Sequence, residues 1–173
     1  MSRPHTAARP LATWAWLLLP AVLCVAATIL IATPLRVFGL RLPEPVFPMI
    51  LPFAWAVIRP SVLGPIILLA VGLFLDLLWG SPLGLWALCL LLVYGGALLA
   101  RQLMAGASMA GLWGWYVGWT VVAFGAAYLF VMLDSHVSPD LMAVGLQFAV
   151  TAVLFPLAYR LIETFEDADT RFR

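Results

Sequence analysis

Asp76 carries the clearest chemical signal in this chain, because it is the only charged residue between Arg59 and Arg101. A carboxylate in so long an apolar stretch is costly in lipid and usually has a reason for being there. We consider three roles for it. The first is that of an interfacial carboxylate that reaches lipid headgroups and caps a turn. The second is that of a partner in an ion pair, and the third is a part in a proton or ion relay. A relay usually needs a second intramembrane acid or histidine, and the sequence offers none.

A turn follows Asp76 after four residues, with the sequence Gly80-Ser81-Pro82-Leu83-Gly84. Gly80 is suited to a left-handed helix C-cap, and Pro82 shortly beyond it prevents the helix from continuing. Gly84 then gives the chain the freedom to begin a new helix. The stretch from Arg59 to Arg101 is therefore predicted to form two helices joined by a tight turn.

The composition indicates an integral membrane protein. Hydrophobic residues make up 65% of the chain and charged residues 10%, with a mean hydropathy of +1.08, against about 45–50% and about 25% in soluble proteins. The net charge of +1 does not favour nucleic acid as a partner. Cysteine and histidine spacing suggests neither a disulfide nor a metal site. Because no catalytic constellation lies at one depth, we expect neither enzymatic activity nor a cofactor.

Six apolar segments predict an all-α fold, a single integral-membrane domain with about six spans: 11–35, 45–58, 62–79, 85–100, 110–133 and 141–159. The first is expected to be a retained helix. The second contains Pro45, Pro48 and Pro52, which oppose a regular helix. We expect a short, bent span there, with a partly re-entrant segment as the alternative.

Arginine distribution predicts the orientation of these spans. With both termini in the cytoplasm, seven arginines lie inside and two, Arg36 and Arg41, lie outside. This bias favours a cytoplasmic N-terminus and C-terminus. It also places Arg36 and Arg41 on the same side as Asp76, which makes them its candidate ion-pair partners.

The fifth segment carries four glycines on one helical face: Gly111, Gly114, Gly118 and Gly125. The interval from Gly114 to Gly118 is a small-xxx-small match, and such a face lets another helix approach closely. Two interpretations are open. The face packs against the protein's own helices, which is the commoner case, or it docks the transmembrane helix of a partner.

The run G-L-F-L-D-L-L-W-G-S-P-L-G-L-W-A-L from Gly72 to Leu88 resembles the signature of the rod shape-determining protein MreD family. That signature is approximately G-x-x-x-D-x-x-x-G-x-x-x-G, and the positions that meet it are Gly72, Asp76, Gly80 and Gly84. The chain length, the proline-bearing second segment and the V-L-F-P stretch ending at Pro156 match more loosely. The C-terminal tail is mixed and acidic here, whereas family members often carry a basic one.

The resemblance implies a non-enzymatic component of the bacterial inner membrane that acts in cell elongation, cell shape and side-wall peptidoglycan synthesis. Its implied partners are membrane lipid and an MreC-like protein, and through the latter an MreB-like filament, a RodA-like polymerase and a class B penicillin-binding protein. The family also resembles the six-helix substrate-binding subunits of energy-coupling-factor vitamin transporters. A small-molecule transporter subunit is therefore the alternative, with Asp76, Asp134, His136 and Gln147 as its few polar candidates.

Overall fold

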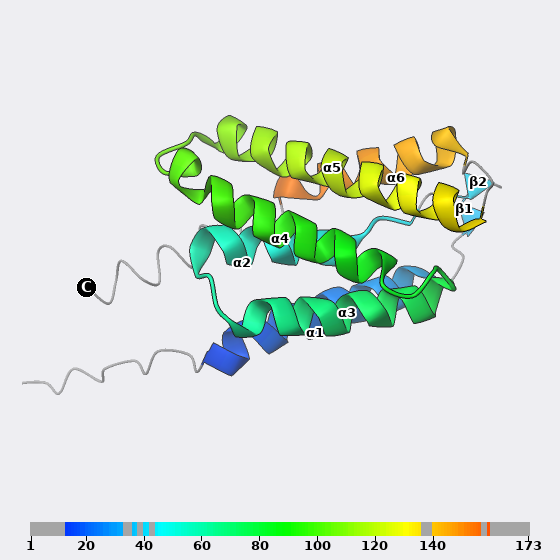
Figure 1. Ribbon diagram of the computed structural model, residues 1–173, viewed down its shortest axis with the longest axis horizontal. Helices are drawn as coiled ribbons and strands as arrows, with labels where there is room; N and C mark the ends of the chain where they lie inside the picture. The colour runs from blue at the N-terminus through cyan, green and yellow to red at the C-terminus, as the bar shows by residue number, and fades with distance from the viewer. Residues whose placement is uncertain are drawn as a thin grey trace, which may run out of the picture.

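The computed structural model describes residues 13–32, 36–37, 40–41, 44–135, 140–156 and 159, and this part of the chain is built from six α-helices (Figure 1). The all-α class predicted from the sequence is thus confirmed. The helices are α1 (Thr13–Ala32), α2 (Ile50–Ile58), α3 (Leu63–Trp79), α4 (Leu85–Met104), α5 (Met109–Ser135) and α6 (Leu141–Val153). A short 3₁₀ turn, η1 (Phe47–Met49), precedes α2. Two-residue strands β1 (Arg36–Val37) and β2 (Leu40–Arg41) form an antiparallel pair.

Helix α4 lies at the centre of the bundle and packs against α2, α3 and α5. Helix α1 lies against η1 and α3, and α6 lies against α5. The α3–α4 turn lies at the same end of the molecule as the strand pair, the end of α5 and the start of α6 (Figure 1). The α2–α3 and α4–α5 connections lie at the opposite end. The connections therefore alternate between two ends, as in an up-and-down bundle.

Helix α2 is the most enclosed element, since every residue from Ile50 to Ala56 is buried. The α-helix of this segment is short, nine residues after a 3₁₀ turn, which agrees with the expectation that its prolines oppose one regular helix over the whole segment. Pro48 lies in the first turn of η1 and Pro52 is the third residue of α2, positions whose N–H groups have no partner within the helix. At about 2.0 and 1.5 Å per residue, η1 and α2 together reach only about 20 Å.

An aromatic cluster fixes α2 against the last part of the bundle. The ring of Phe53 lies 5.4 Å from that of Tyr116 and 6.5 Å from that of Phe155, measured between centroids. The Tyr116 hydroxyl donates a hydrogen bond to the Thr151 carbonyl at 3.1 Å, and the Thr151 hydroxyl accepts one from the Val46 N–H at 3.2 Å. Segments far apart in sequence are thus joined around α2.

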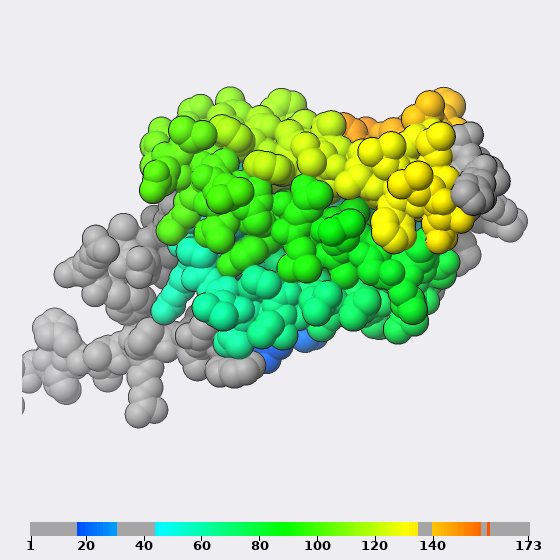
Figure 2. Space-filling model, viewed as in Figure 1, coloured from blue at the N-terminus to red at the C-terminus, as the bar shows by residue number. Residues whose placement is uncertain are grey.

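Among the described residues, two helices are long and apolar enough to cross a membrane, the stretches Leu85–Met104 and Met109–Asp134. They differ in their surroundings. Half of the first is buried inside the protein, whereas the second is largely exposed. Figure 2 shows α5 forming one edge of the molecule, with α4 and α3 following below it. Its outward side chains include Val121, Leu129 and Leu133, all exposed.

Candidate functional site

Asp76 joins α3 to α4 through both its side chain and its backbone. Its carboxylate is only 1% exposed. Oδ1 accepts hydrogen bonds from the Ser81 hydroxyl at 2.9 Å and from the Trp86 N–H at 3.0 Å, and Oδ2 accepts one from the Gly84 N–H at 2.8 Å. The first N–H groups of a helix lack intrahelical partners and form its positive end. The carboxylate of α3 therefore caps the N-terminus of α4.

The carbonyl of the same residue ends α3. It accepts hydrogen bonds from the N–H of Gly80 and from the N–H of Ser81, the latter at 3.0 Å. Gly80 has φ 63° and ψ 28°, which is the left-handed C-cap that the sequence predicts. Gly84 also has a positive φ, 95°. Asp76 thus closes one helix and opens the next within a single tight turn.

The buried position of Asp76 corrects one expectation and leaves another untouched. The carboxylate does cap the turn, but it does not reach out toward headgroups, because the hairpin encloses it. The candidate ion pair with Arg36 or Arg41 involves side chains that lie outside the described part of the structure. The backbones of Arg36 and Arg41 are opposite each other in the β1–β2 pair.

Gly72 permits the close approach of α3 and α4. A Cβ at this position would overlap the Cα and N atoms of Ala87 and lie 2.9 Å from the Ala87 Cβ. Gly72 and Asp76 are one helical turn apart, so both face α4. The four positions of the motif therefore have separate structural tasks. Gly72 sets the helix separation, Asp76 caps both helices, and Gly80 and Gly84 provide the positive φ angles of the turn.

Aromatic residues extend this hairpin to the other helices. The Trp79 indole N–H donates a hydrogen bond to the Glu44 carboxylate at 3.1 Å. The Trp79 and Trp86 rings lie 5.0 Å apart, and Trp86 lies 5.9 Å from Phe124 on α5. The row continues from Phe124 to Phe148 on α6, also at 5.9 Å. Sequence reasoning missed this row and Glu44. The two tryptophans that flank the turn at Gly80 are the sequence signal that could have indicated the aromatic row.

The glycine face of α5 is not packed against the rest of the described protein. A Cβ added at Gly114, Gly118 or Gly125 would meet nothing within 4 Å, and one at Gly111 would meet only the neighbouring Ala107 and Ser108. The commoner interpretation, packing against the protein's own helices, is therefore wrong for the described residues.

The close contact between α4 and α5 depends on a glycine of α4, not on the glycines of α5. The ring of Trp119 on α5 lies where a side chain at Gly96 on α4 would stand. Tight packing of α5 thus depends on its tryptophan and on a glycine of α4. The glycine face of α5 stays exposed along most of its length.

The other polar candidates are distant from this hairpin in sequence, and those that are described are more exposed than Asp76. Asp134 is exposed near the end of α5, Gln147 is half-buried on α6, and His136 falls outside the described residues.

Comparison of the chain with family models, with curated proteins and with solved structures finds no match. The predicted likeness to energy-coupling-factor subunits thus stays a prediction. We infer function from the motif residues and the geometry around them.

Proposed function

We propose that this chain is a non-enzymatic, multi-pass protein of the bacterial inner membrane that acts in the rod complex for cell elongation. In this proposal it crosses the membrane about six times, with both termini in the cytoplasm, and it works together with an MreC-like partner. The observation that carries the proposal is the α3–α4 hairpin. Each residue of the MreD-like signature has its own structural task there, which supports the proposal.

Helix length and chain direction support the membrane placement. The two long apolar helices, α4 and α5, fit the thickness of a bilayer. The connections alternate between two ends of the bundle (Figure 1). The arginine bias assigns one end of the bundle to the cytoplasm, the end with the α2–α3 and α4–α5 connections. Arg59 and Arg101 lie at or near these connections.

The open glycine face of α5 supports docking of a partner's transmembrane helix. In lipid, helices associate through close backbone packing rather than through hydrophobic burial. Gly114, Gly118 and Gly125 leave room for such an approach. The occupant that fits the proposed function is the membrane-spanning helix of the MreC-like partner.

Affinity purification of the tagged protein from its own cells tests the proposal. The wild-type protein should co-purify with an MreC-like membrane protein. Gly118→Leu should lose that partner, because the new side chain fills the open face. Gly145→Leu is the matched control, since Gly145 is an exposed glycine of α6 whose added Cβ would also meet nothing within 4 Å.

The outcomes separate the parts of the proposal. A partner retained by Gly118→Leu would remove α5 as the docking face. A wild-type protein that recovers transporter ATPase subunits in place of an MreC-like protein would favour the transporter alternative and overturn the proposed function.

A further inference from the structure

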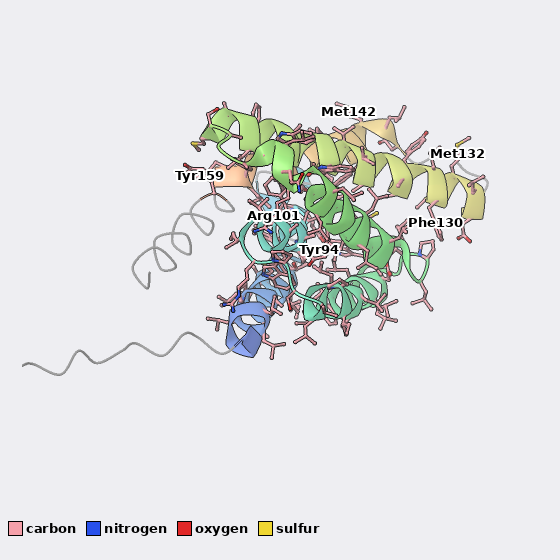
Figure 3. All side chains as sticks on the ribbon, turned by 60° about the vertical axis from the view of Figure 1, so that its left-hand side comes forward. Tyr94, Arg101, Phe130, Met132, Met142 and Tyr159 are labelled. Carbon is pink, nitrogen blue, oxygen red and sulfur yellow. The ribbon has the colours of Figure 1, made fainter. Side chains whose placement is uncertain are left out.

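Helix α4 holds the last turn of α2 and the α2–α3 connection, at one point each. Tyr94 and Arg101 lie seven residues apart on α4, which places them on the same face of the helix. The Tyr94 hydroxyl donates to the Ser61 carbonyl at 3.1 Å and accepts from the Ser61 N–H at 3.2 Å. The Arg101 Nε donates to the Val57 carbonyl at 3.2 Å. Figure 3 shows Tyr94 and Arg101 on this part of α4.

Arg59 lies between these two anchor points. Its backbone N–H caps α2 by donating to the Trp55 carbonyl at 3.2 Å, and its side chain is exposed. Arg59 is two positions after Val57, so their Cα atoms are at most about 8 Å apart. The side chain of Arg101 is fixed at Val57. The guanidinium groups of Arg59 and Arg101 can therefore reach a common ligand.

Neither arginine forms an ion pair with a described residue. Both Arg59 and Arg101 are exposed. The bond to Val57 occupies Nε of Arg101, which leaves its four terminal N–H groups. A planar guanidinium matches the oxygen spacing of a phosphate, and two guanidinium groups can bind the same phosphate.

We infer that Arg59 and Arg101 form a binding site for the phosphate of an anionic phospholipid in the cytoplasmic leaflet. The inference rests on the membrane placement in the proposed function, because that placement puts the ends of α2 and α4 at the cytoplasmic headgroup level. Basic pockets between helices on that side are suited to anionic headgroups. Tyr94 acts as a positioning residue, since it holds the connection that carries Arg59.

Native mass spectrometry of the full chain in detergent tests the site, with phosphatidylglycerol and phosphatidylcholine of the same acyl chains as probes. We expect wild type to prefer phosphatidylglycerol. Arg59→Gln and Arg101→Gln should each weaken its binding about fivefold. Tyr94→Phe should also weaken it with no change in net charge. Arg173→Gln, which removes the same charge from the C-terminus of the chain, should leave it unchanged.

Three results would overturn the inference. The first is equal binding of the two lipids by wild type. The second is a loss in Arg173→Gln as large as in Arg59→Gln, which would mean that net charge alone attracts the lipid. The third is displacement of the lipid by equimolar inorganic phosphate. Arg59→Gln breaks no side-chain hydrogen bond of the described residues, so it tests the site even where Arg101→Gln unfolds. A failed lipid preference with intact partner co-purification would leave the rod-complex proposal standing.

Discussion

Gly72 on α3 lies so close to the backbone of Ala87 on α4 that a side chain at Gly72 would overlap it. This contact brings Asp76, one turn further along α3, within hydrogen-bond distance of the first N–H groups of α4. The helix separation and the cap therefore depend on each other. A change at Gly72 moves the carboxylate away from its donors, and a change at Asp76 removes a bond that holds the two helices together.

Gly72→Ala should destabilise the protein by about 1–3 kcal/mol, the usual cost of an extra methyl group in a tight core contact. Thermal unfolding in detergent measures the change. Gly95→Ala is the control, because Gly95 lies on α4 and its added Cβ would meet nothing within 4 Å. It should be neutral or slightly stabilising, through the higher helix propensity of alanine. Equal stability of the two variants would contradict the close contact at Ala87.

Asp76→Asn should loosen the start of α4. The amide oxygen of an asparagine can still accept the hydrogen bonds from Ser81 and Trp86. Its NH₂ group then faces the Gly84 N–H, and two donors cannot form a hydrogen bond with each other. Leaving such a buried donor without an acceptor costs about 1–3 kcal/mol. Amide hydrogen exchange at Gly84 and Trp86 should speed up, and Asp76→Ala should speed it further. Asp134→Asn, at an exposed carboxylate near the end of α5, should leave that exchange unchanged. Unaltered exchange in Asp76→Ala would show that the carboxylate does not cap α4.

Gly80→Val should cost on the order of 1 kcal/mol or more, because a β-branched residue is strained at a φ of 63°. Space is not the limit, since an added Cβ would meet nothing within 4 Å. Asparagine tolerates the left-handed region better than other non-glycine residues, so Gly80→Asn should recover much of the loss. Membrane levels and unfolding temperatures of the two variants check this. A valine variant as stable as the asparagine one would mean that the φ angle does not matter.

Reporter fusions should place Ser81 outside the cytoplasm and Ser61 and Met104 inside it. The α3–α4 turn lies at one end of the bundle, and the α2–α3 and α4–α5 connections lie at the other. Fusions at Pro43 and Val137 should also read external, and one at the C-terminus internal. Because η1 and α2 together are short, the fusion at Pro43 is the most informative about whether the second segment crosses the membrane. A cytoplasmic reading there, with Ser81 external, would mean that the second segment does not cross.

The sequence was sufficient for the helical segments and for the turn, because both depend on local signals. Gly80 and Pro82 act on their own stretch of chain, and the apolar segments coincide closely with the helices. The role of Asp76 was only partly predictable. Its donors lie five to ten residues ahead, so the cap could be expected, but its burial depends on the contact between Gly72 and Ala87. No local pattern marks Ala87 as the residue that meets a glycine.

The glycine face of α5 shows the limit of motif reasoning most clearly. A row of glycines indicates that a helix can be approached, but it does not say by what. In the structure, Trp119 fills the space at Gly96 and so determines which side of α5 faces α4.

Depletion of this protein in its own cells, with cell width followed by microscopy, tests the proposed function most directly. We predict that rods widen and become round as the protein is lost, that wild type and Gly145→Leu restore the rod shape, and that Gly118→Leu does not. Rods of normal width after complete depletion would contradict the assignment to the elongation complex.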